Sequence, residues 1–464
     1  MESRYSRRFF IGGALSFGAL AGCKAFTRAG AAAEGGELLK LGVLSDIHIN
    51  TEAQVPCFIR ALEFFRMRKV DGVLIAGDMA DNGRIDQMKL VADAWFKVFP
   101  DGKGADGQEV KQLFIYGNHD MHGYAEPNLG KDPKGEWEKF FHEEWSPIMK
   151  SEVKGIPVIR AHWVNGKAGN QVEAWMKEHG KELDPALPFV YTQHDHPKDT
   201  CFNSWAWGHD DGRATRALSP YPNAIAFSGH SHYTLTDDRT YWQGAFTSIN
   251  TASLRYASYD YSLRENIGGN GSGFHGENRR HRMAQKPQDD GNQGQVVSFW
   301  RDHLAVERRE FCYGESLGDE LVIPLPAAES KPFSYAARAA KRSAPEFAEG
   351  AAVKVEFAEP KDEKDFHHIE LTFPAAAEVN RCRVSEYEVT AVLVEDDVEL
   401  VQAQRRMMSP DHYLPRTKLV DTVGFTFAKE DLPIKGHYRF EVRALECFGK
   451  KGDKIVSPIV EVKA

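Results

Sequence analysis

The sequence has few cysteines for its length, and none of them form a short paired motif. There are 6 cysteines in 464 residues, and no two have the Cys-x-x-Cys spacing. A zinc ribbon and a disulfide-dense scaffold are therefore excluded. Apart from Cys23, which lies in the N-terminal segment, five cysteines remain. Because five is odd, at least one thiol is expected to stay outside any disulfide.

The sequence also lacks an excess of basic residues. Lys and Arg together number 58 against 67 Asp and Glu, which gives a formal net charge of −9. This balance excludes the basic face of a general nucleic-acid-binding protein, so no nucleic-acid partner is expected. With 42% hydrophobic and 27% charged residues, the chain is a globular protein and not a polytopic membrane protein. At about 150 residues per domain, it should form two or three domains, and no tandem repeat is evident.

The N-terminal residues predict an export signal. Arg7 and Arg8 stand directly before a Gly- and Ala-rich apolar stretch at residues 12–20, which is too short to span a bilayer as a stable helix. This arrangement resembles a twin-arginine signal, which exports proteins that are already folded. We therefore expect residues 1–37 to be a signal and tether, and the protein to reach the bacterial periplasm or cell envelope.

Two cleavage sites compete within this segment. Residues 20–23, Leu-Ala-Gly-Cys, resemble a lipobox, whereas residues 31–33, three alanines, resemble an ordinary signal-peptidase site. We favour the lipobox, in which acyl chains on Cys23 would anchor the protein to a membrane surface without a spanning helix. Membrane contact is expected only through this signal or anchor, and the sequence leaves the oligomeric state open.

From residue 38 the pattern is that of an α/β domain. Phe58, Leu62 and Phe65 recur at helical spacing and predict a helix over residues 56–68. Short β-branched or aromatic runs predict strands before and after it. The strands that precede the polar clusters described below are expected at 39–44, 72–76, 112–116, 189–192 and 224–227. Further strands are expected at 244–254, 295–300 and 304–311.

The 18 histidines are the unusual feature of the composition, and several follow these predicted strands. Loops at the carboxyl ends of strands in open α/β sheets build the functional site, so polar clusters from distant parts of the sequence can converge there. The clusters are Ser45-Asp46-Ile47-His48, Gly77-Asp78, Gly117-Asn118-His119-Asp120, Gln193-His194-Asp195-His196 and Gly229-His230-Ser231-His232.

The C-terminal part has a different pattern. Prolines and an Ala/Lys/Arg tract predict a linker over residues 313–345, and the region 346–464 contains short alternating strands without helices. Residues 436–444, followed by Gly449 and by Ser-Pro at 457–458, resemble the last strands of a fibronectin type III domain. The strands expected there are 353–357, 368–373, 385–393, 422–427, 438–444 and 455–462.

The ordered blocks D-x-H, G-D, G-N-H-D, H and G-H-x-H resemble the calcineurin-like metallophosphoesterase family over residues 38–312. The resemblance implies a four-layer α/β/β/α sandwich, here followed by an all-β, fibronectin type III-like sandwich. It also implies two divalent or mixed-valence metal ions, and His with carboxylate ligands suits Fe, Mn, Zn or Co. The first metal would take Asp46, His48, Asp78 and His232, and the second would take Asp78, Asn118, His194 and His230.

The resemblance also assigns roles beyond the metal ligands. His119 would be the general acid that protonates the leaving-group oxygen, and Asp81 matches the aspartate that pairs with that histidine in the protein phosphatase branch. This sequence has Asn82 where that branch has a phosphate-binding arginine, and Asp120 where it has a glutamate. A Ser/Thr protein phosphatase is therefore disfavoured. No tyrosine follows Asp78 as in purple acid phosphatases, so no tyrosinate colour is expected.

One ligand position stays open between two histidines. His194 ends the predicted strand and is favoured, whereas His196 lies further into the loop and would contact substrate or a ligand. Asn250 and Arg255 are further candidates to line the site. Residues 279–282, Arg-Arg-His-Arg, are most simply interpreted as a solvated loop.

The sequence thus predicts an exported phosphoesterase that hydrolyses a small phosphate mono- or diester by attack of metal-bound hydroxide. Two metal ions supply a nucleophile near neutral pH and positive charge around the phosphate oxygens. The alternative, from another class, is a surface-anchored binding or adhesion protein with an inactive phosphoesterase fold. The complete ligand set argues against that alternative, and the choice between monoester and diester stays open.

Overall fold

The computed structural model describes most of the chain after the N-terminal segment, in ranges separated by short gaps and one longer gap. Within these ranges, no helix combines the length and apolar character that crossing a membrane requires. The predicted signal, both candidate cleavage sites and the basic cluster at 279–282 lie outside the described residues. The described ranges are 36–123, 126–164, 171–202, 206–258, 291–327, 333–359, 368–396, 398–428 and 431–463.

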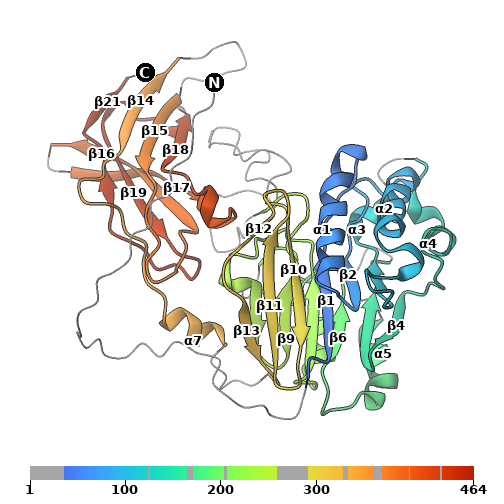
Figure 1. The fold of residues 1–464 in the computed structure, drawn as a ribbon. Coiled ribbons are helices and arrows are strands. Elements are labelled where there is room, and N and C mark those ends of the chain that lie inside the picture. Colours follow the sequence, from blue (N-terminus) through green and yellow to red (C-terminus); the bar gives the residue numbers. More distant parts are fainter. Residues whose placement is uncertain are drawn as a thin grey trace, which may run out of the picture. The chain divides into compact units, whose positions relative to one another are not determined.

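The first sheet contains three parallel strands that begin the chain's α/β region (Figure 1). β1 (Leu39–Leu44), β2 (Gly72–Ala76) and β3 (Lys111–Ile115) lie side by side in this order. On its other edge β1 pairs with an antiparallel strand from much later in the sequence, β10. The remaining strands extend the sheet from there: β10 (Gln293–Phe299), β11 (His303–Glu310), β12 (Glu315–Ser316) and β13 (Leu321–Pro324).

The second sheet is also mixed. Its order is β4-β5-β6-β7-β9-β8, in which β5, β6, β7 and β9 run parallel and the two outer strands run antiparallel to their neighbours. The strands are β4 (Ile148–Val153), β5 (Ile156–Ala161), β6 (Phe189–Thr192), β7 (Ala224–Ser228), β8 (Tyr241–Gln243) and β9 (Thr247–Asn250).

Alternation along the strands arranges both sheets and the helices into layers. Leu41 and Leu74 of the first sheet share one buried apolar cluster with Val190 and Ile225 of the second. The opposite faces of the sheets pack on separate sets of helices, because neighbouring side chains of a strand point to opposite faces. α1 (Val55–Met67), α2 (Ile85–Val98) and α4 (Pro133–Phe141) cover the first sheet; α5 (Val172–His179) and α6 (Arg213–Leu218) cover the second.

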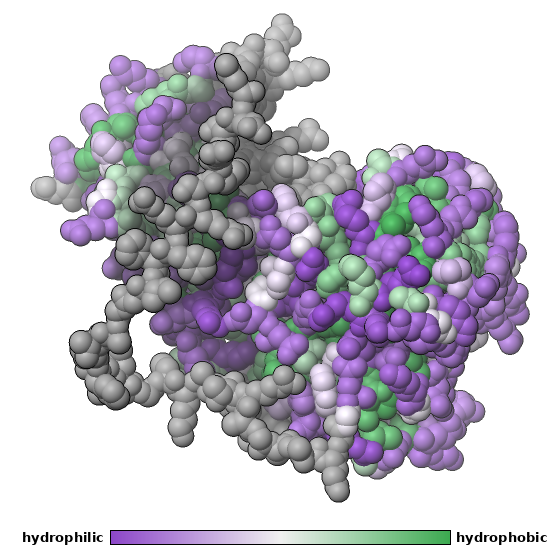
Figure 2. All heavy atoms as spheres, in the orientation of Figure 1, coloured by the Kyte–Doolittle hydropathy of each residue, from purple (hydrophilic) through white to green (hydrophobic). Residues whose placement is uncertain are grey.

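Helix α1 illustrates how the sequence determines this packing. Phe58, Leu62 and Phe65 are fully buried on one face of the helix, and Pro56 stands in its first turn, where the missing amide hydrogen has no intrahelical partner to lose. The predicted helix 56–68 differs from the observed one by a single residue at each end. Hydrophilic residues cover most of the viewed face of the α/β region, with smaller hydrophobic areas between them (Figure 2).

The C-terminal region is all-β and consists of two sheets around their own core. Val389 and Phe440 of one sheet pack against Ile369 and Phe425 of the other. One sheet has the order β14-β15-β18, and the other has β17-β16-β19-β20 with β21 also on β19. The strands are β14 (Lys354–Ala358), β15 (His368–Pro374), β16 (Glu386–Glu395), β17 (Val398–Met408), β18 (Thr422–Ala428), β19 (Gly436–Leu445), β20 (Ile455–Val456) and β21 (Val460–Val462).

Three sequence-based expectations differ from the structure. The segment 313–345 contains β12, β13 and α7 (Tyr335–Ala340), and the two strands pair with β11, so the first half of the expected linker belongs to the first sheet. The expected strand 455–462 is two strands, because Pro458 has no amide hydrogen to donate to a ladder. The expected strand 244–254 shortens to Thr247–Asn250, and the residues after it form a loop.

Candidate metal centre

Five loops with polar side chains follow the carboxyl ends of parallel strands. These strands are β1, β2 and β3 in the first sheet and β6 and β7 in the second. The backbone joins the loops in pairs: the His48 amide donates to the Asp78 carbonyl over 3.0 Å. The Gly229 amide likewise donates to the His194 carbonyl over 2.9 Å. The main chain therefore fixes the loops relative to one another.

Several side chains of these loops project from an unusual backbone conformation. A positive φ is uncommon for residues other than glycine, and such residues cluster at functional sites, where the surrounding structure stabilises them. The residues with positive φ here include five of the predicted metal ligands: Asp46 (49°), His48 (46°), Asp78 (52°), His230 (67°) and His232 (57°).

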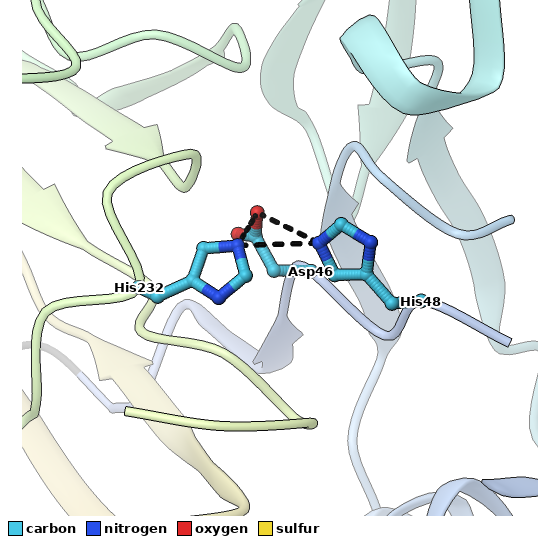
Figure 3. A group of neighbouring side chains, drawn as sticks. All are labelled: Asp46, His48 and His232. Carbon is cyan, nitrogen blue, oxygen red and sulfur yellow. Dashed lines mark hydrogen bonds and ion pairs between the residues drawn. The ribbon is translucent and has the colours of Figure 1, made fainter. Parts of the chain in front are cut away.

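Asp46, His48 and His232 form the first group of potential metal ligands (Figure 3). The Nε2 atom of His232 lies 3.0 Å from Oδ1 of Asp46 and 3.2 Å from Nε2 of His48. Nε2 of His48 lies 3.8 Å from the same Asp46 oxygen. All three residues are buried. Two imidazole nitrogens and a carboxylate oxygen thus point toward one place, as Figure 3 shows.

Asp78, His194 and His230 form a second group, whose ligand atoms all lie within 4.8 Å of one another. Nε2 of His194 lies 3.0 Å from Oδ2 of Asp78. The other ring nitrogen of His194, Nδ1, lies 2.7 Å from the carbonyl oxygen of Ala76. A histidine that binds a metal commonly donates its second nitrogen to a carbonyl, which fixes the ring. His194 therefore presents Nε2 toward the site.

The two groups are adjacent, and Asp78 lies between them. Oδ2 of Asp78 is 3.8 Å from Nε2 of His48, a member of the first group. Asp78 also shares a third group of possible ligands with His48 and His119. A carboxylate has two oxygens, so it can contact two cations at once. Asp78 therefore lies between two groups of candidate ligands and has oxygens available to both.

Buried atoms without hydrogen bonds support a cation at this place. Oδ1 of Asn118 and Oδ1 of Asp46 are buried and accept no hydrogen bond within the part of the chain that the structure describes. Leaving such oxygens unsatisfied is costly in a protein interior, whereas bound metal ions would use them as ligands. Imidazole nitrogens together with carboxylate and amide oxygens suit borderline transition metals. The residues present therefore fit a two-metal centre.

In the metal-free site, protonated histidines compensate the negative charge of the carboxylates. A bound cation would take over this role. Burial alone would raise the pKa of Asp46, but His232 and His48 outweigh it and hold that pKa well below its usual range. Burial opposes the charged form of His48, yet its carboxylate neighbours raise its pKa to about 9. The same balance, with Asp78 as the nearest carboxylate, raises the pKa of His194 to about 10. Protons on these rings neutralise the carboxylates when no metal does so.

The structure places Asp81 and His119 differently from the sequence-based expectation. The expected contact joins the Asp81 carboxylate to His119, but that carboxylate lies 3.1 Å from Nδ1 of His48. The His119 ring instead places Nδ1 2.7 Å from the backbone carbonyl oxygen of Asp81. The cause is local: the Asp81 amide donates to the carbonyl of Ile49, which holds Asp81 beside the loop that carries His48. Asp81 thus orients His48.

His196 occupies a different environment from His194. Its Nδ1 lies 2.6 Å from Oγ of Ser228, and its Nε2 lies 2.7 Å from Oγ of Ser231. Both ring nitrogens are therefore engaged with hydroxyl groups. Of the two histidines left open by the sequence, His194 is the one whose nitrogen faces Asp78.

Other residues singled out in the sequence surround the centre. Arg255 donates to the carbonyl of His48 and lies 3.7 Å from the Asp81 carboxylate. Asn250 donates to the carbonyl of Tyr233 over 2.6 Å and so supports the following loop. The Tyr256 ring lies 4.3 Å from that of His232 between centroids.

Sequence reasoning missed two tryptophans beside the centre. The Trp207 ring stacks at 4.6 Å from the His230 ring, and Trp163 lies 5.9 Å from it. The buried indole N–H of Trp163 has no hydrogen-bond partner among the described residues. Trp163 follows β5, a strand that the sequence analysis did not identify. Recognising β5 would have placed Trp163 at a carboxyl end, together with the histidines.

Comparison with known proteins gives a family match for the first part of the chain. Residues 39–234 match the family model described as calcineurin-like phosphoesterase. The search of curated proteins gave no match.

Among solved structures, a predicted phosphoesterase from Streptococcus pneumoniae TIGR4 is 13% identical, with a TM-score of 0.28 over 62% of this chain and 98% of that chain. A dimetal phosphatase from Danio rerio is 11% identical, with a TM-score of 0.35 over 62% and 99%. The protein described as the anchor in the inner membrane complex of Plasmodium is 12% identical, with a TM-score of 0.37 over 63% and 90%.

The strand-end ligands, their spacing and the family match cover the same residues. Asp46 and Asp78 lie within the matched segment, as do all the histidines of the three ligand groups. The family usually binds two metal ions, and the grouping around Asp78 offers places for two. The α/β region of the chain therefore matches the calcineurin-like phosphoesterase family over residues 39–234.

Proposed function

We propose that this protein is a dinuclear metal-dependent hydrolase of phosphate mono- or diesters. The observation that carries the proposal is the position of Asp78 between two groups of ligands, with His194 on one side at 3.0 Å and His48 on the other at 3.8 Å. When bound, two metal ions would activate a water molecule for attack on phosphorus and stabilise the charge on the phosphate oxygens.

The chain's own residues set the net charge of such a centre. Asp46 and Asp78 are its two carboxylates, whereas Asn118 and the histidines bind as neutral ligands. Two dications contribute about four positive charges, and two carboxylates return about two. The residual positive charge would attract a phosphate ester. A carboxylate in place of the Asn118 amide would weaken that attraction.

His119 is suited to donate a proton to the leaving group. Its Nδ1 faces the Asp81 carbonyl, which can only accept, so Nδ1 carries a hydrogen. Its backbone amide donates to Oδ1 of Asp78 over 2.8 Å, which ties its position to the bridging residue. A ring held in this way can donate a proton from Nε2 when it is an imidazolium ion. We assign this residue the role of general acid.

The test combines metal analysis with turnover. The protein is purified, loaded separately with Mn, Fe, Zn and Co, and assayed with p-nitrophenyl phosphate and bis-p-nitrophenyl phosphate. About two metal ions per chain and turnover of either ester would support the proposal. Absence of both would favour a binding or adhesion protein whose phosphoesterase fold is inactive, and one ion with turnover would overturn the dinuclear assignment.

We further propose that the protein is exported, with a fibronectin type III-like C-terminal sandwich as a spacer or support for the catalytic domain. Arg7 and Arg8 before the apolar stretch support export, and the Leu-Ala-Gly-Cys sequence supports lipidation of Cys23. Mass spectrometry of the mature N-terminus tests both points. A diacylated Cys23 would support the anchor, whereas an unmodified start near Glu34 would contradict it.

A further inference from the structure

Two cysteines that are far apart in the sequence face each other beside the metal-centre loops. Sγ of Cys57 lies 3.6 Å from Sγ of Cys312, although 255 positions separate them. Cys57 stands in the first turn of α1, and Cys312 lies two residues after the end of β11. The other described cysteines, Cys201, Cys382 and Cys447, are buried. This pair is therefore distinguished by both its proximity and its access to solvent.

We propose that Cys57 and Cys312 are a redox-active thiol pair that closes to a disulfide by exchange with a small-molecule disulfide such as oxidised glutathione. A disulfide bond is about 2.05 Å long, so the sulfurs need to approach by about 1.5 Å. The two side chains line a cavity of about 200 Å³, which leaves space for this movement.

The environment assigns different roles to the two thiols. Cys312 is exposed, and Nη2 of Arg60 lies 3.4 Å from its sulfur. The Arg60 guanidinium is held there because its Nε donates to the carbonyl of Phe311 over 3.2 Å. A nearby guanidinium stabilises a thiolate, which is the form that attacks a disulfide. The thiol of Cys57, only partly exposed, has a raised pKa because of its contact with Cys312 and its burial.

The exchange proceeds in two balanced steps. The Cys312 thiolate attacks one sulfur of the small disulfide, forms a mixed disulfide and releases one thiolate. Cys57 then loses its proton and attacks the Cys312 sulfur, so the intramolecular bond forms and the second small thiolate leaves. Two protein thiols are oxidised while one small-molecule disulfide is reduced to two thiols. No other reactant is needed.

The bond would connect the start of α1 to the segment that follows β11. The same cavity is also lined by Ile47 and Arg255, which belong to the loops around the metal centre. A cross-link between positions so far apart in the chain restricts the unfolded state strongly. In the oxidised form, the disulfide would therefore cross-link the chain beside the loops that surround the metal centre.

The test uses the purified full-length chain equilibrated with oxidised or with reduced glutathione, followed by alkylation and non-reducing tryptic digestion. The expected product after oxidation is a linked pair of peptides, residues 41–60 with residues 310–338. The thermal midpoint should rise by about 5 °C in the oxidised form. Cys57→Ser and Cys312→Ser should each abolish both effects, whereas the matched control Cys382→Ser should retain both.

Several outcomes would overturn the proposal. One is recovery of Cys57 and Cys312 as alkylated thiols after full equilibration with oxidised glutathione. Another is stable glutathione adducts at these positions without the linked peptides. Linkage of the peptide 310–338 to a peptide other than 41–60 in the oxidised protein would also contradict it, because another cysteine would then be the partner. Metal loading is not needed for any of these measurements, so they are independent of the proposed hydrolase activity.

Discussion

Oδ2 of Asp78 lies 3.0 Å from Nε2 of His194 and also 3.8 Å from Nε2 of His48, so one carboxylate oxygen serves both ligand groups. Asp78→Asn keeps the shape of the side chain and removes its charge. We expect the metal content to fall from about two ions per chain to less than one, because both sites lose the bridging carboxylate. Elemental analysis of the refolded and dialysed protein measures this, with the exposed Asp93→Asn as the control. Unchanged metal content would contradict the bridging position.

The general-acid role of His119 predicts an effect that depends on the leaving group. His119→Ala should slow hydrolysis of esters with poor leaving groups by about 10²- to 10⁴-fold. Activated aryl esters should lose less, because their leaving oxygen needs little protonation. The kcat values of the variant over a series of aryl phosphates measure this, with metal content as a check and His122→Ala as the control. An equal loss for every leaving group would refute the role.

The pH dependence of metal binding follows from the raised pKa values of His48 and His194, about 9 and about 10. A metal ion has to displace the protons on these rings, so its apparent affinity should rise with pH by about ten- to hundredfold per unit between pH 7 and 9. Competition titration with a chromophoric chelator at several pH values measures the slope. A flat profile would show that these rings are neutral before the metal binds.

The same groups predict how the metal-free protein responds to alkali. Both folded pKa values lie above the value of about 6.5 for an unfolded histidine, so the paired imidazolium ions contribute stability that is fully present below that pH. This contribution is lost as pH rises through about 9 to 10. The thermal midpoint of the metal-free protein should therefore fall over this window, and that of the metal-loaded protein should fall less. Equal declines in both forms would argue against the assignment.

Asp120 is expected to hold two loops of the centre together. Its carboxylate accepts hydrogen bonds from the amides of Gly117 and Ala80, at 2.8 and 2.7 Å, and from that of Met79 at 3.3 Å. Asp120→Ala leaves these buried donors unsatisfied and should lower the free energy of unfolding by about 3 kcal/mol. Asp120→Asn retains an acceptor and should cost less. Denaturant titration compares the two, and equal losses would show that hydrogen bonding at this position is unimportant.

Gly229 permits a close approach between the two sheets' loops. A Cβ atom at this position would lie 2.3 Å from Oγ of Ser45 and 2.4 Å from Oδ2 of Asp46. Gly229→Ala should therefore displace Asp46 and reduce metal content while the far-ultraviolet circular dichroism spectrum stays unchanged. Gly36→Ala, where a Cβ would meet nothing within 4 Å, is the matched control. Normal metal content in Gly229→Ala would contradict the tight contact.

The strands that carry the centre could be predicted because they are short, apolar and followed by polar clusters. β1, β2 and β6 have the predicted bounds. Two strands, β4 and β5, were not predicted. β4 contains Lys150 and Glu152 among its apolar residues, and β5 contains Pro157, so neither shows a regular strand pattern. Without β5, the position of Trp163 could not be recognised.

The partners of Asp81 show a second limit of sequence reasoning. Family resemblance assigns Asp81 to His119, but the side chain that it meets depends on the hydrogen bond from its own amide to Ile49. That bond joins two loops about 30 residues apart, and no local pattern encodes it. The local strand pattern determines which residues stand at the ends of strands. Contacts between loops determine which of these residues are in contact with one another.

The pairing of β1 with β10 also defines how much of the chain the first sheet needs. The family match ends at residue 234, yet β10 begins at Gln293 and every residue in it is buried. A fragment cut at the end of the match would turn β1 into an open edge, with unpaired backbone groups that invite aggregation. The paired strands of this sheet extend through Pro324, where β13 completes its pairing with β11. The smallest soluble fragment that keeps this sheet intact should therefore end about 90 residues beyond the matched sequence.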